Sequence, residues 1–528
     1  MEKIALKVKE WISNHKLEFV LLVAILAVGA FFRLYRIDEY MTFLGDEGRD
    51  ARIVRAFITQ GDIMLIGPGT SIGNMFLGPM YYYFIAPGLL LANFSPVGPS
   101  VQIALFGVAT IFLVWLLARE WFPHYDKASR GTATHTNWGA LIAALLYAIA
   151  PTTIIFSKSS WNPNIMPFAA IMLIYSAWRV WQHREYWWLM VAGFMMAFSL
   201  QSHYLGLLLA PTAGLFLISP TFSALRSKKD RKKYIKYAAG GVAVFLLLMS
   251  PLLIFDVRHN FINFNAMKVF FTERQTTVSA RPWSALPTAW PITVDFATRL
   301  LGGRNPLLGQ WIALGIGGII LWLATEARGK LSRREWSAYL LIVVWLGFAV
   351  IGLGLLKQQI YDHYYGFFFP APFLLIGGIA TYLLRNYRVR GWWIVGTALT
   401  FIVYYNLLDN PLRFPPNRQL QRTITIADSI RRDAAGEQFN LAVIAERNYE
   451  AAYQYYLEIW DTGVTNIDPQ NTGETIAEHL YVVCEFADKS KCDPTHDAKT
   501  EVANFGWSVI DEQWEVAGVH VFKLAHSQ

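Results

Sequence analysis

Charged residues are scarce in this chain. Of its 528 residues, 16% are Asp, Glu, Lys or Arg, whereas 54% are hydrophobic and 15% are aromatic. A soluble protein of this size needs far more charge to cover its surface, so the composition argues against a soluble enzyme. Repeated apolar stretches of about 20 residues also exclude disorder and a coiled coil. The composition therefore predicts a membrane protein with many spanning helices.

Cysteine is almost absent as well. The two cysteines are Cys484 and Cys492, and a C-x7-C spacing without a second pair fits no zinc signature. In an oxidising compartment the two residues can form a local disulfide, and otherwise they are free thiols. The sequence leaves both states open. It also identifies no cofactor and leaves a divalent metal open.

The net charge of +8 is distributed unevenly. Residues 409–528 contain 10 Lys or Arg and 19 Asp or Glu, a net charge of −9, and the rest of the chain carries +17. The basic excess therefore lies in the hydrophobic part, where loop charge sets membrane orientation, and does not indicate binding to nucleic acid. The acidic tail indicates a separate soluble domain.

Twelve apolar segments are candidates for spanning helices. They are residues 17–34, 77–94, 97–119, 138–156, 164–182, 186–201, 203–219, 237–255, 309–325, 337–356, 364–384 and 392–408. Segment 77–94 contains Pro79, Pro87 and Gly88 and begins with three tyrosines, which favours a position on the outer surface or a partial dip into the membrane. We therefore predict eleven spanning helices.

The parity of this count fixes the predicted orientation. The lysine-rich start, with no signal cleavage site after it, indicates a retained first helix entering from the cytoplasm. With eleven spans, four basic loops then face the cytoplasm, as the positive-inside rule requires: Arg119–Arg130, Arg226–Lys233, Arg328–Arg334 and Arg385–Arg390. We expect a multi-pass protein of the plasma membrane whose C-terminal domain is extracytoplasmic.

The same orientation places the longest connections on the outer face. These are residues 35–96, 157–163, 256–308 and 357–365. A transporter usually has short connections and its chemistry near the bilayer midplane, so this arrangement favours an enzyme at the outer leaflet.

The predicted domains are a spanning domain at 1–408, a linker at 409–420 and a soluble domain at 421–528. In the soluble domain, helices are predicted at 424–434 and 449–460, and strands at 440–445, 479–484, 507–509 and 516–524. This alternation predicts a small α/β domain.

The motif Leu44-Gly-Asp-Glu-Gly-Arg-Asp50 follows the first spanning helix by about a dozen residues. Two adjacent carboxylates near the bilayer surface, Asp46 and Glu47, can accept a proton from a hydroxyl or hold a metal. The simpler interpretation is that Asp46 caps a helix starting at Glu47. Both interpretations can hold, because a cap fixes Asp46 in place.

Residues 47–60 have an amphipathic pattern. Their apolar positions form one stripe, while Arg49, Arg52 and Arg55 repeat at three-residue spacing on another face. Such a helix lies flat at the headgroups, where arginine pairs with phosphate, although the same spacing also describes a solvated basic face.

The segment Lys357-Gln-Gln-Ile-Tyr-Asp-His-Tyr-Tyr365 gathers cationic, tyrosyl and imidazole groups at a predicted outer helix end. Lys357, Tyr361 and His363 suit a phosphate-bearing ligand whose negative charge grows as a bond breaks. His203 and Arg258 also occupy predicted outer ends. For these two residues, structural hydrogen bonding or exposure is the simpler interpretation.

A short outer turn, Ser157–Pro163, completes the set. Trp161 can stack on a sugar ring, and Asn162 and Asn164 can donate hydrogen bonds to its hydroxyl groups. An anchor at the membrane interface is the alternative role for Trp161.

In the order of these features the chain resembles the polytopic GT-C-type glycosyltransferases that use lipid-phosphate sugars, such as the protein O-mannosyltransferases and the lipid A aminoarabinose transferases. The resemblance lies in the Asp46-Glu47 pair of a long first outer loop and in the following Gly78-Pro79-Met-Tyr81-Tyr82 stretch. It implies a GT-C-like fold, Asp46 as the essential acidic residue with Glu47 as its neighbour, and a sugar or acceptor role for Tyr82. Where the family often has an aspartate after a proline, this sequence has Asn162-Pro163-Asn164.

The resemblance implies an inverting transfer from a polyprenyl-phosphate sugar to an acceptor hydroxyl at the outer membrane face. The expected enzyme is a hexosyl- or pentosyltransferase, with membrane lipids and an acceptor protein, lipid or glycan as partners. A transporter or flippase of a lipid-linked solute is the alternative. It predicts ionisable groups inside the spans, which contain almost none. A noncatalytic sensor predicts a cytoplasmic output module, for which the inner loops are short.

Overall fold

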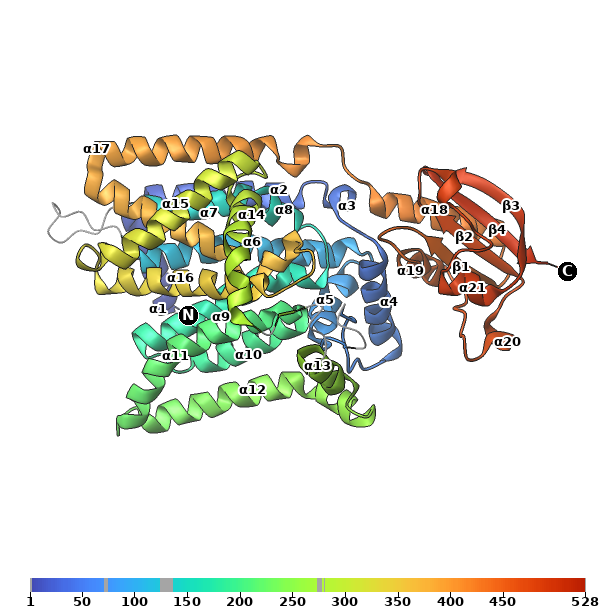
Figure 1. Cartoon of the computed structure of the whole chain (residues 1–528), viewed down its shortest axis with the longest axis horizontal. Helices are drawn as coiled ribbons and strands as arrows, with labels where there is room; N and C mark the ends of the chain where they lie inside the picture. The colour runs from blue at the N-terminus through green and yellow to red at the C-terminus, as the bar shows by residue number, and fades with distance from the viewer. Residues whose placement is uncertain (1, 71–74, 124–135, 273–277, 280, 528) are drawn as a thin grey trace.

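The computed structural model of the chain describes residues 2–70, 75–123, 136–272, 278–279 and 281–527. Parts of three predicted loops, 35–96, Arg119–Arg130 and 256–308, lie outside these ranges. A bundle of long helices forms most of the molecule, and a small sheet domain is attached to one end of the bundle (Figure 1). The predicted fold class, a helical membrane protein with a C-terminal α/β domain, is confirmed.

The bundle consists of α1 (Glu2–Asn14), α2 (Lys16–Leu34), α6 (Val97–Trp121), α7 (Trp138–Ile149), α8 (Pro151–Ile155), α9 (Met166–His183), α10 (Trp188–Ser202), α11 (Leu209–Arg226), α12 (Arg231–Arg258), α14 (Leu286–Phe296), α15 (Pro306–Thr325), α16 (Arg333–Gly354) and α17 (Pro370–Leu408). The short η3 (Pro282–Ala285), η4 (Ala297–Leu301) and η5 (Ala327–Gly329) connect some of them. Each predicted apolar segment from 97 onward coincides with a helix or with consecutive helices. The segment 138–156 is interrupted at Ala150, because Pro151 ends α7 and starts α8.

Seven helical segments of the described chain are long and apolar enough to cross a membrane: α2, Tyr204–Arg226, α12, α6, α15, α16 and α17. Helix α17 is counted once although it has two arms, since the chain reverses at Arg388, whose φ is +43° (Figure 1). Helices α7 and α10 are apolar but shorter. The predicted number of eleven spans therefore stays a prediction.

The basic loops gather at one end of the bundle. The described part of Arg119–Arg130 and the loops at 226–233, 328–334 and 385–390 all lie at the end opposite the C-terminal domain (Figure 1). This arrangement agrees with the charge pattern that the sequence predicts, because basic loops collect on one side of a membrane.

Segment 77–94 forms α5 (Met80–Leu91), a helix of 12 residues packed between α4 (Gly45–Gln60) and α6. A helix of this length is too short to cross a bilayer. Its start is fixed by Gly78, where an added Cβ would lie 2.2 Å from the side-chain oxygen of Gln201, which accepts the N–H of Met80 (3.2 Å).

The predicted outer loop 256–308 is only partly a loop, and this prediction was wrong for its second half. It contains α13 (Ile262–Thr272), α14 and η4, and α14 packs against α15 and α16 and runs across the long helices (Figure 1). In the structure Pro282 and Pro287 stand in the first turns of η3 and α14, where a proline needs no N–H partner.

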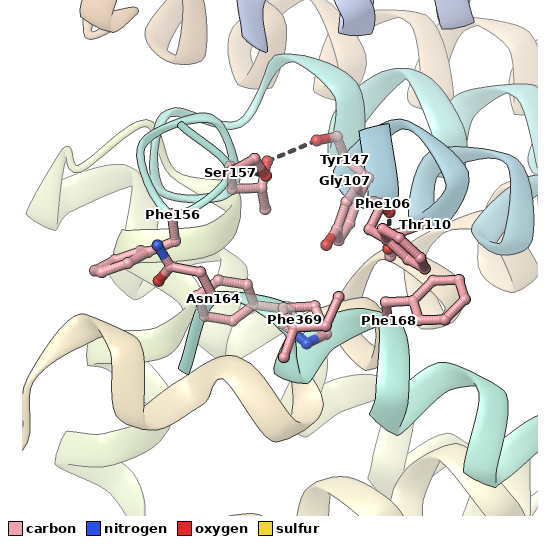
Figure 2. Close-up of a pocket in the computed structure, with 12 residues that line it drawn as sticks. Phe106, Gly107, Thr110, Tyr147, Phe156, Ser157, Asn164, Phe168 and Phe369 are labelled. Carbon is pink, nitrogen blue, oxygen red and sulfur yellow. Dashed lines mark hydrogen bonds between the residues drawn. The ribbon is translucent and has the colours of Figure 1, made fainter. Parts of the chain in front are cut away.

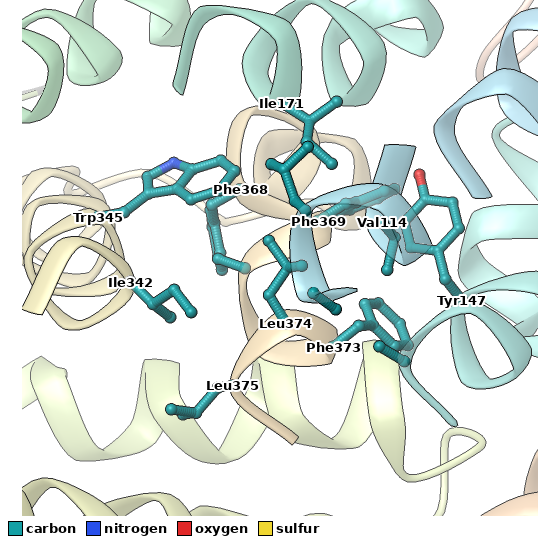
Figure 3. Packing of buried hydrophobic residues seen from close by; sticks show 14 of the residues in the cluster. Val114, Tyr147, Ile171, Ile342, Trp345, Phe368, Phe369, Phe373, Leu374 and Leu375 are labelled. Carbon is teal, nitrogen blue, oxygen red and sulfur yellow. The ribbon is translucent and has the colours of Figure 1, made fainter. Parts of the chain in front are cut away.

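The bundle core lies where α16 and α17 meet α7 and α9. Figure 3 shows Trp345, Phe368, Phe369, Phe373 and Leu374 interdigitating there, all almost completely buried. On the far side of α7, the buried guanidinium of Arg33 donates to Ala148 O (2.9 Å) and to Thr153 Oγ1 (3.1 Å). A buried charge needs such partners, so Arg33 holds α2 against the α7–α8 bend.

The C-terminal domain contains α18 (Gln419–Ala434), α19 (Ala451–Ile459), α20 (Thr472–Thr475), α21 (Thr500–Phe505) and a sheet of β1 (Phe439–Ile444), β2 (His479–Cys484), β3 (Ser508–Val516) and β4 (Val519–His526). The strand order is β1-β2-β4-β3, with β1 and β2 parallel and the other pairs antiparallel. Strand β3 is longer than the predicted 507–509, because it is mostly exposed and therefore lacks the buried pattern of β1. Cys484 and Cys492 form a disulfide.

The domain division at 408 and 421 stays a prediction. The structure ends α17 at Leu408 and begins α18 at Gln419, with η7 (Pro411–Arg413) between them. The C-terminal domain is docked on the bundle end through α3 (Ile37–Tyr40) and α4: Glu39 pairs with Arg418 (3.2 Å), and α4 packs against α19.

Candidate active site at the bundle end

Helix α4 lies between the bundle and the C-terminal domain and runs across the direction of the long helices (Figure 1). Its apolar residues Val54 and Phe57 pack against Tyr82 of α5 and Tyr455 of α19 in one cluster. The predicted amphipathic helix therefore exists, and its apolar stripe is covered by α5 and by the C-terminal domain.

The helix begins at Gly45, two residues earlier than the sequence suggested, so the interpretation of Asp46 as its cap was wrong. Leu44 is the N-cap residue, and its N–H donates to Glu47 Oε2 (3.1 Å). Glu47 therefore closes the first turn, and Asp46 is left to point elsewhere.

Asp46 is held by three donors from three parts of the chain. Its Oδ1 accepts from Arg49 Nη1 (2.9 Å) and from the hydroxyl of Tyr449 (3.0 Å), and its Oδ2 accepts from Trp161 Nε1 (3.1 Å). The side chain stays 40% exposed. A carboxylate has about four lone-pair positions, so three donors fix its orientation and leave one position on Oδ2 for a further proton.

The two neighbouring carboxyl groups, Glu47 and Asp50, are buried, unlike that of Asp46. Burial raises the pKa of Glu47 to about 7 and that of Asp50 to about 6, although Arg49 Nη2 donates to Asp50 Oδ1 (2.7 Å) and opposes the shift of Asp50. Tyr82, buried on α5, lies beside Asp50. Among these three carboxyl groups, Asp46 is the one that reaches the solvent-accessible space.

Two cavities meet at Asp46 and Trp161. The first, which we call the apolar cavity, has a volume of about 270 Å³ and is lined by Leu44, Glu47, Ile155, Phe156, Arg447 and Tyr449 among others. The second, the histidine cavity, has about 230 Å³ and is lined by Arg49, Thr70, Asn162, His203, Tyr204 and His363 among others. The hydrogen bond between Trp161 and Asp46 forms part of the boundary between them.

Two of the predicted site residues, His203 and His363, come from distant segments of the chain and line the histidine cavity together. The ring of His363, in η6 (Asp362–Phe368), lies 4.5 Å from that of Trp161 and 5.8 Å from that of His203. Burial lowers the pKa of His363 to about 4 and that of His203 to about 3, so both imidazoles are neutral at neutral pH. They can hydrogen-bond to a ligand but do not supply the positive charge that the sequence suggested.

The two asparagines have structural partners. Asn162, in η1 (Asn162–Ile165), donates to Ser202 O (2.6 Å), and Asn164 Nδ2 donates to Ser159 O (2.8 Å). Figure 2 shows Asn164 and Phe156 at a small inner pocket of about 10 Å³, lined also by Phe106, Phe168 and Phe369. Because Asn164 and Phe156 also line the apolar cavity, this pocket is its aromatic floor.

Other predicted residues lie away from both cavities. Arg52 is bound to Gln454 and Glu458 of α19, and Arg55 lies near Tyr455. Arg258 is exposed at the end of α12, Lys357 is exposed before η6, and neither is among the residues that line the two cavities. Tyr361 is half exposed and stacks on His363, with ring centroids 5.8 Å apart.

Three site residues were missed: Arg447, Asn448 and Tyr449, all from the C-terminal domain. A signal for them exists in the Gly-Asp-Glu-Gly motif. A Cβ on Gly45 would lie 2.2 Å from the ring of Tyr449, and one on Gly48 would lie 2.4 Å from the backbone of Ala452. Two glycines three residues apart on one helix face indicate the close approach of another element, here α19.

No metal site is evident among the described residues, which contain no group of three His, Cys, Asp or Glu side chains able to hold an ion. The oxygens of Asp46 accept hydrogen bonds from side chains instead. The arrangement can orient a carboxylate, accept a proton and bind a ligand that extends into both cavities.

Known proteins resemble the chain in sequence over one segment and in fold over nearly its whole length. Residues 77–255 match the family model of the dolichyl-phosphate-mannose-protein mannosyltransferases. This segment covers α5 to α12 and includes Trp161 and His203 but not Asp46. A sequence search of curated proteins found no match.

The fold is similar to that of ArnT from Cupriavidus metallidurans, solved bound to undecaprenyl phosphate (TM-score 0.56, 16% identity) and in the apo state (TM-score 0.57, 15% identity). Each match covers 97% of this chain and 99% of ArnT. It is also similar to the archaeal oligosaccharyltransferase AglB from Archaeoglobus fulgidus, with a TM-score of 0.52 and 15% identity over 91% of this chain and 70% of AglB. The chain is thus a multi-pass membrane protein with a fold similar to those of ArnT and AglB, and its segment 77–255 resembles the dolichyl-phosphate-mannose-protein mannosyltransferases.

Proposed function

We propose that the protein transfers a sugar from a polyprenyl-phosphate donor to an acceptor hydroxyl at the outer membrane face, with inversion at the anomeric carbon. The observation that carries this proposal is the position of Asp46 between two cavities of different character. The apolar cavity suits the lipid-linked phosphate, and the histidine cavity, with its neutral hydrogen-bonding groups, suits the acceptor.

The proposed reaction is a single displacement. The acceptor oxygen attacks the anomeric carbon while Asp46 takes the hydroxyl proton. The bond between that carbon and the phosphate oxygen breaks, and its electron pair leaves with the phosphate. Asp46 fits the role of base because its donors leave one lone-pair position open on Oδ2. The face of Trp161 can stack on the sugar between the two cavities.

The outer location is supported by two observations at opposite ends of the molecule. The basic loops lie at the far end of the bundle, where the positive-inside rule places the cytoplasm (Figure 1). The disulfide between Cys484 and Cys492 is in the C-terminal domain, and disulfides persist in oxidising compartments outside the cytoplasm. The site lies at the end where this domain is attached.

The replacement Asp46→Asn tests the proposal most directly. Asn keeps the shape of the side chain but cannot take the proton, so transfer from polyprenyl-phosphate sugars should fall about a hundred- to ten-thousandfold. The rate is measured in proteoliposomes with a panel of donors. Asp62→Asn is the matched control, since Asp62 is exposed just beyond the same helix and should leave the rate unchanged. Undiminished transfer by Asp46→Asn would exclude Asp46 as the base.

A further inference from the structure

The C-terminal domain is fixed to the active-site helix by a small polar loop, residues 446–450. Buried Asn448 is its central residue: its Oδ1 accepts the N–H of Gly45 (2.8 Å) and the N–H of Tyr449 (2.9 Å). Its Nδ2 donates to Glu485 Oε1 (2.6 Å). The loop therefore has a defined position relative to the first turn of α4.

The contact between α4 and the domain is close. The missing side chains of Gly45 and Gly48 give room to the Tyr449 ring and to the backbone of Ala452. On the same side, Arg52 binds Gln454 and Glu458. These contacts hold the loop against the wall of the apolar cavity, so the domain is part of that wall and not a remote appendage.

Arg447 stands in this wall. It is the only cationic side chain among the described residues that line the apolar cavity, and no described residue forms a hydrogen bond or an ion pair with its guanidinium. The nearest other cation at the site, Arg49, already binds Asp46 and Asp50. The charge of Arg447 is therefore available to a ligand in a cavity that Ile155 and Phe156 also line.

We propose that Arg447 binds the phosphate of the lipid donor in the apolar cavity, so that the C-terminal domain completes the donor site. This inference rests on the proposed function. During transfer the phosphate takes the electron pair of the broken bond and gains one negative charge, while Asp46 gains the acceptor's proton. A guanidinium can bind two phosphate oxygens at once and stabilises that growing charge.

The test is a titration of the detergent-solubilised full chain with undecaprenyl phosphate and, separately, with undecaprenol, which has the same tail without the phosphate. Arg447→Ala should weaken the binding of undecaprenyl phosphate about tenfold or more and leave that of undecaprenol unchanged. Arg447→Lys keeps the charge but loses the two-point contact, so its affinity for undecaprenyl phosphate should lie between those of the wild type and Arg447→Ala. Arg432→Ala, on exposed α18, removes one charge from the same domain and should bind as the wild type does.

Three results would overturn the inference. The first is that the wild type and Arg447→Ala bind undecaprenyl phosphate with equal affinity. The second is that Arg432→Ala loses as much affinity for this lipid as Arg447→Ala does, which would indicate a general charge effect. A loss of undecaprenol binding in Arg447→Ala would assign the residue to the tail or to folding. If the wild type bound the lipid phosphate but transferred no sugar, the proposed function alone would fail.

Discussion

The two cavities that meet at Asp46 are similar in volume but hold opposite kinds of titratable group. The apolar cavity contains an acid, Glu47, whose pKa burial raises to about 7, and the histidine cavity contains two bases, His203 and His363, whose pKa values burial lowers to about 3 and about 4. Burial disfavours charge on both sides. The other ionisable groups near the reacting atoms include Asp46, Arg49, Asp50 and Arg447, and Arg49 pairs with Asp50.

The opposite shifts predict opposite pH responses. The unfolded chain binds fewer protons at Glu47 than the folded chain does, so the stability that Glu47 contributes is lost as the pH rises from 4.5 through about 7. The unfolded chain binds more protons at His203 and His363, so their contribution is lost as the pH falls from 6.5 through about 4. The site region should therefore be most stable in mildly acidic solution.

The boundary between the cavities gives the largest expected effect. Trp161→Phe keeps the ring contact with His363 but removes the donor to Asp46 Oδ2. Because hydrogen bonds to charged groups contribute about 1.5–3 kcal/mol, we expect the transfer rate to fall about tenfold or more. Steady-state kinetics in proteoliposomes measure it, with Trp507→Phe as control because Trp507 is 81% exposed in the C-terminal domain. An unchanged rate would mean that the boundary bond has no role in orienting Asp46.

Tyr449→Phe should have a smaller effect, because Arg49 still donates to the same oxygen of Asp46. Burial raises the pKa of Tyr449, so its hydroxyl stays a donor throughout the working range of pH. Without it we expect a rate loss of about threefold, since Asp46 has lost one of its three donors. An unchanged rate would assign Tyr449 to domain docking alone.

The smallest effect concerns stability rather than rate. Glu47→Gln keeps an oxygen that accepts the Leu44 N–H but has no proton to lose. Below about pH 5 the variant and the wild type should unfold at the same temperature, and above about pH 7 the variant should be more stable by a few degrees. Thermal unfolding in detergent across this range measures the difference. Parallel curves for the two proteins would show that Glu47 is ionised in the folded state at neutral pH.

The sequence predicted the membrane helices well, and its site residues stay a prediction. Long apolar runs identify helices because the interior of a bilayer leaves a backbone few other structures. Asp46, Trp161 and His363 were recognised from residue type and predicted side, and the structure brings them together. Arg258 and Lys357 do not line the cavities in the structure. The sequence could not show this, because residue type and a shared membrane face do not determine which loops meet.

The helices at 282–301 were missed because prolines usually interrupt a helix. Here Pro282 and Pro287 stand in the first turns of η3 and α14, and Pro291 lies inside α14. The length of the exposed strand β3 was underestimated for another reason. A strand with little buried surface leaves only a weak alternation of apolar and polar residues in the sequence.

Local composition alone predicts the helical membrane architecture, the acidic soluble tail and an acidic motif beyond the first spanning helix. These follow from local composition, since burial in lipid or in a sheet acts on each segment separately. The contacts of Asn448 with Gly45 and of Tyr449 with Asp46, across about four hundred residues of chain, appear only in the folded structure. That contact depends on how two domains dock, and its trace in the sequence is the absence of two side chains, at Gly45 and Gly48.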